Sequence, residues 1–131
     1  MDRTGARAAA MKLVYEWEMG GDGGEETRQD LLEIQPGEND CDYMEQIFAG
    51  VQAHADDIDA EISKFAVDWK IDRISRVDLA IMRVAICEIK YAGQSAGVAV
   101  NEALELARTY STPEAVPFIN GVLGSFVRSL Q

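Results

Sequence analysis

The segment that most constrains the fold is "RVDLAIMRVAICEIKYAG", residues 76–93, because it is apolar around nearly its whole circumference when placed on a helix. Its apolar residues recur at helical rather than alternating spacing, and they are Leu79, Ile81, Met82, Val84, Ala85, Ile86 and Ile89. Ser75 and Asp78 have the spacing of a capping box at its start, and Gly93 ends it. A helix without a wide polar face must be enclosed, so this segment predicts a central, buried helix.

Other segments predict the helices that surround it. Residues 4–19 are rich in helix formers and are stopped by "GGDGG"; their apolar stripe is Ala8, Met11, Val14 and Tyr15. A short amphipathic piece is expected around residues 31–34. Spacings of three and four predict one long helix over residues 41–65, with the apolar positions Val51, Ala55, Ile58, Ile62 and Phe65. Residues 100–110 predict a further helix.

The C-terminal stretch "VPFINGVLGSFV" contains Asn120-Gly121, a dipeptide typical of β-hairpin turns. The flanking residues do not alternate, and Ile119, Val122, Leu123 and Phe126 follow helical spacing, so a helix is predicted. Gly121 and Gly124 each cost a helix about 1 kcal/mol, which suggests that either another backbone of the chain or a partner packs closely at these positions. Pro117 predicts a kink or the start of the helix.

Together these segments predict an all-α fold of six or seven helices, with no convincing strand. The chain has 131 residues, of which 47% are hydrophobic, enough for one domain or two small subdomains that share a core. The two cysteines form no Cys-x-x-Cys pair, and no signal peptide or run of 18 apolar residues is present. These features predict a cytoplasmic protein.

The charge distribution limits the partners. The net charge is −11, and residues 1–61 hold sixteen acidic and four basic side chains, whereas residues 62–131 hold seven and eight. Bulk charge of this sign opposes non-specific binding of polyanions. This charge distribution still allows a local basic patch at the N-terminus or within residues 62–131.

No pattern in the sequence predicts catalysis, a cofactor or a metal site. The single histidine, His54, precedes Asp57 and Glu61 at helical spacing, but no Glu-x-x-His pair accompanies it, so a surface histidine is favoured. Cys41 and Cys87 lack the context of a nucleophile. The "GGDGG" segment lacks the lysine of a phosphate-binding loop.

Two features leave a structural and a binding interpretation open. Arg3 and Arg7 lie one turn apart at the start of the first helix, where the helix dipole disfavours cations, so they are either a solvated helix end or a contact for an anion or nucleic acid. Phe118, next to Pro117, either belongs to the core or offers a ring on which a base can stack.

Several motifs together resemble the NusB family of bacterial transcription antitermination factors. They are "YMEQIFAGVQAHADDID", "DWKIDRI", "ISRVDLAIMRVAICEIKY", "VAVNEALELARTYS" and "FINGVLGSF", and the likeness is weakest over residues 20–40. The resemblance implies an all-α pair of small helical bundles. It implies one domain over residues 1–131, with N-terminal helices at about 1–70 and C-terminal helices at about 71–131.

The resemblance also implies a function without catalysis. Family members bind the single-stranded RNA element boxA and pair with ribosomal protein NusE, within an RNA polymerase elongation complex that contains other Nus factors, during rRNA synthesis. The residues at the RNA-contact positions of the family are Arg3, Arg7, Glu114 and Phe118. The positions that face NusE are Tyr15 and Asp78.

The chain departs from the family pattern in its basic residues. Only Arg3 and Arg7 stand where the family has a dense arginine cluster, and Gly97 and Pro117 replace typical lysines. Fewer phosphate contacts predict weaker RNA binding and a shallower salt dependence. Two alternatives stay open: an RNA-holding accessory module related to the N-terminal domain of RNA cytosine methyltransferases, and an adaptor that binds only proteins.

Overall fold

The computed structural model describes residues 2–20 and 40–131, and these residues form helices and no strand. The elements are α1 (Arg3–Glu18), α3 (Asp40–Ala53), α4 (Ala55–Phe65), the 3₁₀ turn η1 (Ile71–Arg73), α5 (Arg76–Tyr91), α6 (Ala96–Tyr110) and α7 (Ala115–Ser129). The all-α fold class is therefore confirmed. None of the described helices has the length and apolar character needed to cross a bilayer. The amphipathic piece expected around residues 31–34 lies outside the described residues.

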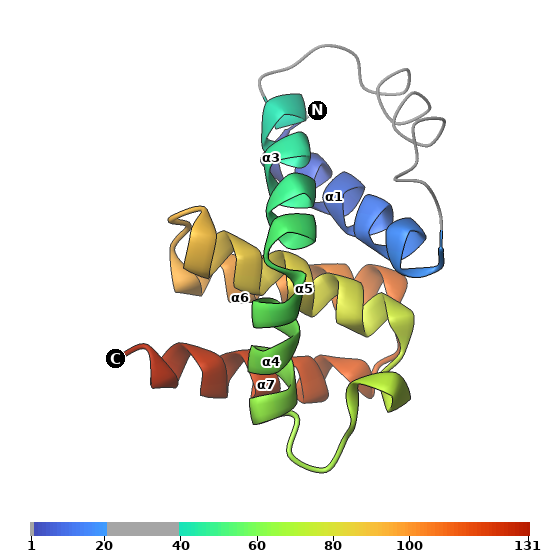
Figure 1. The fold of residues 1–131 in the computed structure, drawn as a ribbon, viewed down its shortest axis with the longest axis vertical. Helices are drawn as coiled ribbons and strands as arrows, with labels where there is room; N and C mark the ends of the chain where they lie inside the picture. Colours follow the sequence, from blue (N-terminus) through green and yellow to red (C-terminus); the bar gives the residue numbers. More distant parts are fainter. Residues whose placement is uncertain (1, 21–39) are drawn as a thin grey trace.

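Helix α5 is the centre of the molecule, as its sequence predicts. Its residues from 78 to 88 are all buried. Figure 1 shows α1 and α3 above α5, with α4 and α7 below it, and α6 alongside. Because α5 packs against each of the other α-helices that the structure describes, these helices share one continuous apolar core.

Local hydrogen bonds fix both ends of α5. The Ser75 hydroxyl accepts from the backbone N–H of Asp78 at 3.1 Å, which is the first half of a capping box. At the other end Gly93 has φ +70°, a left-handed conformation that glycine adopts without strain. This turn brings the N–H of Gln94 to the carbonyl of Glu88 at 2.9 Å, and the N–H of Ala92 bonds to the carbonyl of Cys87 at 3.1 Å, so two carbonyls of the last turns find donors.

Two details of the predicted helices are wrong. The long helix over residues 41–65 is divided at His54, whose backbone leaves the helical region with φ −118° and ψ 23°. The hydrogen bonds His54 N–H to Gly50 and Ile58 N–H to His54 continue across the break, so apolar spacing alone did not reveal it. In α1 the predicted positions Met11 and Val14 are buried, but Tyr15 is exposed, and the buried face also contains Ala6, Ala10 and Leu13.

The close neighbour predicted for Gly121 and Gly124 is absent from the described residues. A Cβ at Gly121 would meet nothing within 4 Å, and one at Gly124 would meet only the Arg128 side chain of the same helix, at 3.4 Å. The buried stripe of α7 runs instead through Ile119, Val122, Leu123 and Phe126. Pro117 neither kinks α7 nor begins it, because it lies in the first turn, where its missing N–H has no intrahelical partner.

Gly121 is therefore a position where alanine is expected to stabilise the fold. Gly121→Ala should raise the free energy of unfolding by about 1 kcal/mol, because the helix gains propensity and the added methyl group meets open space. Urea unfolding followed by circular dichroism measures the change. A loss of stability in this variant would show that another group does lie against Gly121.

Candidate nucleic-acid and partner interface

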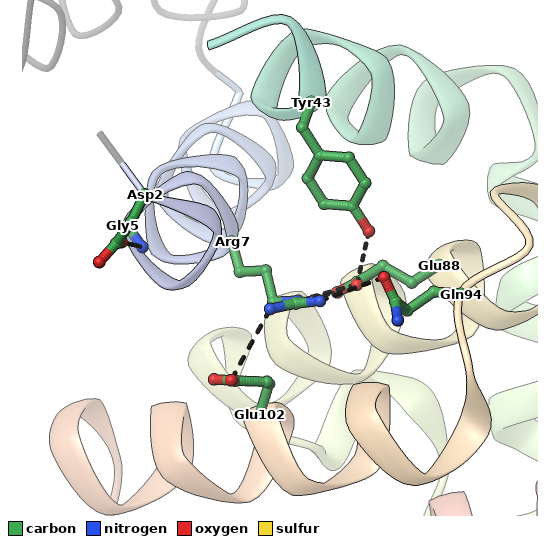
Figure 2. Close-up of polar contacts among 7 residues, drawn as sticks. All are labelled: Asp2, Gly5, Arg7, Tyr43, Glu88, Gln94 and Glu102. Atoms are coloured by element: carbon green, nitrogen blue, oxygen red, sulfur yellow. Dashed lines mark hydrogen bonds and ion pairs between the residues drawn. The ribbon is translucent and has the colours of Figure 1, made fainter. Parts of the chain in front are cut away.

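Arg7 lies at the centre of a buried polar network that joins four helical segments. Its Nε donates to both carboxylate oxygens of Glu88, at 2.8 and 3.1 Å, and Nη2 donates to the Gln94 side chain at 3.3 Å. Nη1 lies 3.8 Å from the Glu102 carboxylate, and the Tyr43 hydroxyl donates to Glu88 at 2.6 Å. Figure 2 shows the guanidinium of α1 between these partners from α3, α5 and α6.

Arg7 has a structural role, because it pairs with Glu88 inside this buried network. Arg7 is only 3% exposed and Glu88 only 1%. The sequence suggested that stability does not require a cation at the start of α1, but Glu88 supplies a buried counter-charge from 81 residues away. A direct contact between Arg7 and a phosphate would require this network to open. The geometry assigns Arg7 to holding the helices together.

Arg3 is the exposed member of the predicted pair. Its guanidinium lies 3.8 Å from the centre of the Tyr43 ring, a cation–π arrangement. Tyr43 is itself buried, and burial together with the hydrogen bond to Glu88 raises the pKa of its hydroxyl well above the ordinary value. The hydroxyl therefore stays protonated and keeps donating to Glu88, so the ring under Arg3 is held in place.

Glu114 and Phe118 lie at the start of α7, beside a pocket of about 290 Å³. Phe118 is half-buried, so it belongs neither wholly to the core nor wholly to the surface. Its ring meets Trp69 edge-to-face at 6.3 Å. The residues that line the pocket are Trp69, Arg73, Ile74, Ser75, Asp78, Thr112, Glu114, Ala115 and Phe118.

Asp78 connects this pocket to the turn between α6 and α7. Its carboxylate accepts from the Ser111 hydroxyl at 2.6 Å, and the residue is 9% exposed. Ser75 meets the Asp78 backbone, as the capping box requires, while the side chain of Asp78 reaches Ser111 instead of completing the box as the sequence suggested. Asp78 therefore ties α5 to the segment that carries Glu114 and Phe118.

Tyr15 borders a second, smaller hollow on the other side of the first turn of α5. This hollow has a volume of about 160 Å³, and its lining residues are Met11, Lys12, Tyr15, Val77 and Tyr110. The neighbours Val77 and Asp78 face different hollows, so the two pockets flank one turn. Tyr15 is 36% exposed and Tyr110 41%, and Lys12 lies 5.1 Å from the Tyr110 ring.

The candidate site residues thus form two groups. Asp78, Glu114 and Phe118 share one pocket, and Tyr15 lies close by. Arg3 and Arg7 lie near the other end of α5, where Glu88 is ten residues from Asp78, or about 15 Å along a helix at 1.5 Å per residue. A ligand that touches both groups must be extended.

Three participants were not predicted from the sequence. Glu88 and Tyr43 are invisible to periodicity because their contacts to Arg7 are long-range, and Trp69 falls between predicted helices. No sequence pattern relates Trp69 to Phe118, whose ring it meets 49 positions later in the chain.

The histidine considered for a metal site has other neighbours. The His54 ring stacks on Tyr91, with centroids 3.7 Å apart and planes 3° from parallel. The Asp57 carboxylate accepts from Lys90 at 2.7 Å and from the Tyr91 hydroxyl, and these two hydrogen bonds lower its pKa. Within residues 2–20 and 40–131, no group of three or more histidine, cysteine, aspartate or glutamate side chains could hold a metal ion.

Comparisons with known proteins identify a family that matches this chain over almost its whole length. Residues 4–128 match the model of the NusB family. The transcription antitermination protein NusB of Acetivibrio thermocellus is 44% identical over 130 residues, which cover 98% of this chain and 90% of that protein.

Solved structures agree in fold. The NusB structure from T. maritima has a TM-score of 0.83 at 26% identity, covering 98% of this chain and 92% of that one. A crystal structure of antitermination factors NusB and NusE with double-stranded RNA has a TM-score of 0.86 at 24% identity, covering 97% and 96%. Sequence and structure agree over almost the whole length, and the chain belongs to the NusB family.

Proposed function

We propose that this chain is a transcription antitermination factor that binds boxA-type single-stranded RNA together with NusE. In this proposal the pair acts within the RNA polymerase elongation complex, with other Nus factors, during rRNA synthesis. The observation that carries it is the 44% identity, over 98% of the chain, to a NusB transcription antitermination protein. Proteins of this family are adaptors and not enzymes.

The RNA part of the proposal is supported by the fold and by the pocket at α7. A protein of the same fold has been crystallised with NusE and double-stranded RNA. In this chain the half-buried Phe118 offers a ring and Glu114 a carboxylate at the same pocket, a combination suited to an unpaired base. Arg3 supplies a cation at the other end of α5, and Arg7 holds the helix that carries Arg3.

The NusE part is supported by the exposed aromatic surface beside α5. Tyr15 and Tyr110 border the hollow that contains Val77, next to Asp78. Tyrosine is enriched at protein interfaces because it buries a large apolar ring and keeps a polar end. We therefore place NusE over Tyr15 and the first turn of α5, directly next to the pocket at Phe118.

Net charge predicts how the two partners cooperate. At −11 this chain repels an RNA strand, and only Arg3 of the two N-terminal arginines lies at the surface. A partner that adds basic surface beside the pocket offsets that repulsion. Isolated protein should therefore bind boxA RNA weakly, and addition of NusE should tighten binding by at least about tenfold, a coupling typical of 1–3 kcal/mol.

A filter-binding titration of boxA RNA with and without NusE measures this coupling. Tyr15→Ala should weaken the NusE-dependent increase, while Tyr91→Ala, which removes a comparably exposed tyrosine at the far end of α5, should not. Equal RNA affinity with and without NusE would contradict the proposed cooperation. NusE binding without any RNA binding would favour the adaptor that binds only proteins.

A further inference from the structure

Trp69 is the most conspicuous side chain that the proposed function has not used. It lies between α4 and η1, it is 54% exposed, and its indole is held edge-to-face against Phe118 at 6.3 Å. An indole buried in the core would contribute far more to stability than one left half in water. The chain therefore holds a large aromatic face at the surface, in a fixed position at the mouth of the pocket.

The pocket has the size and walls for one flat heterocycle. Its volume is about 290 Å³, close to the lower limit of about 300 Å³ for small-molecule sites. Trp69, Phe118, Ile74 and Ala115 form apolar walls that come from two segments far apart in the chain, residues 69–74 and 115–118. Such a space accepts one base and excludes a helix or a strand of a partner protein.

The polar rim of the pocket discriminates between ligands. Asp78 and Glu114 contribute carboxylates, which only accept hydrogen bonds, and Arg73 contributes an exposed cation. Adenine, guanine and cytosine carry an exocyclic amino group that can donate to a carboxylate, whereas uracil presents two carbonyl oxygens around a single N–H. Carboxylates opposite these carbonyls would be unfavourable.

We propose that this pocket holds one unpaired RNA base that carries an exocyclic amino group. The base stacks on the exposed Trp69 indole, which Phe118 supports edge-to-face; its amino edge faces Asp78 and Glu114, and the adjoining phosphate lies beside Arg73. This inference rests on the proposed function and adds to it Trp69, Arg73 and a preference against uracil. A basic side chain from a protein could also meet two carboxylates, but Arg73 at the same rim repels a cation and attracts a phosphate.

The test uses the full chain with NusE and boxA-type RNA. Trp69→Ala should weaken RNA binding about 10- to 100-fold, with an unchanged salt dependence because stacking is not a phosphate contact. Trp69→Phe should retain most of the affinity. Arg73→Gln should reduce the slope of log affinity against log salt by about 0.7, the contribution of one phosphate in a single strand.

Controls separate stacking from folding and from protein binding. Val67→Ala alters the same loop at a side chain that is 85% exposed and is not part of this pocket, and it should leave RNA affinity unchanged. Thermal unfolding of each variant identifies loss of structure. In a Trp17→Phe protein, Trp69 is the remaining tryptophan, and its fluorescence should be quenched on addition of RNA.

An abasic scan of the RNA locates the base. At one RNA position, removing the base or replacing it with uracil should weaken binding to the wild-type protein. The same change should not weaken binding to Trp69→Ala any further. If wild-type protein with NusE binds RNA but Trp69→Ala binds it equally well, this inference fails and the proposed function stands. If Trp69→Ala weakens NusE binding without RNA, the pocket takes a protein side chain instead. If wild-type protein with NusE binds no RNA, both proposals fail.

Discussion

Arg7→Ala is expected to lower the free energy of unfolding by about 3–5 kcal/mol, the usual cost of removing one partner from a buried ion pair. Glu88 would keep a negative charge at 1% exposure, and Gln94 and Glu102 would lose the cation they face. The loss is far larger than that of an exposed arginine at a helix start, which is within about 0.5 kcal/mol. Denaturant unfolding measures it.

Two control variants separate the charge from the packing. Arg3→Ala removes the exposed arginine one turn away and should cost about 1 kcal/mol or less, the value of an exposed cation–π contact. The double variant Arg7→Met/Glu88→Leu removes both buried charges and should recover part of the stability lost in Arg7→Ala. If Arg7→Ala were no more destabilised than Arg3→Ala, the buried network would not exist in solution.

The same variants decide how α1 acts on RNA. If Arg3 contacts a phosphate and Arg7 only positions the helix, Arg3→Ala should reduce the slope of log affinity against log salt by about 0.7, while the double variant keeps the wild-type slope. Affinity is measured with NusE present and below the unfolding transition of each protein. An equal reduction of slope in the double variant would assign a phosphate contact to Arg7 as well.

The helices were predictable because their signals are local. The apolar circumference of residues 76–91 and the stripe Ile119, Val122, Leu123 and Phe126 need only neighbours three or four positions away to be recognised. The division at His54 was not predictable from apolar spacing, because the buried positions on both sides of it keep the same period. Glycine at 121 suggested close packing, but the structure leaves open space there.

The candidate site was predictable only in part, because its parts meet through tertiary contacts. The family resemblance brought Asp78, Glu114 and Phe118 forward, and the fold places them on one pocket although they are up to 40 positions apart. No periodicity relates Arg7 to Glu88 or Trp69 to Phe118. Burial was not predictable either, since Arg3 and Arg7 look equivalent in the sequence, yet Arg3 is exposed and Arg7 is buried.

Because of Cys87, the free energy of unfolding should fall in alkali, by about 2 kcal/mol at pH 10.5. The thiol is 1% exposed and donates to the Ile47 carbonyl at 3.8 Å. Burial, with a smaller contribution from the neighbouring Glu88 carboxylate, raises its pKa from 9.0 to about 12. Because the unfolded thiol loses its proton first, stability is complete below pH 9 and falls by up to about 1.4 kcal/mol per pH unit up to pH 12.

Unfolding by urea at pH 8 and pH 10.5 tests this. Cys87→Ala should be less stable than wild type at pH 8, because it leaves a cavity, but its stability should fall by about 2 kcal/mol less on going to pH 10.5. Tyr43, whose raised pKa has the same sign, contributes a further decrease above pH 10 in both proteins. Val84→Ala is the matched control, since it removes buried volume from the same helix and no titrating group. Val84→Ala should keep the wild-type dependence of stability on pH. If Cys87→Ala also kept it, the buried thiol would not resist ionisation.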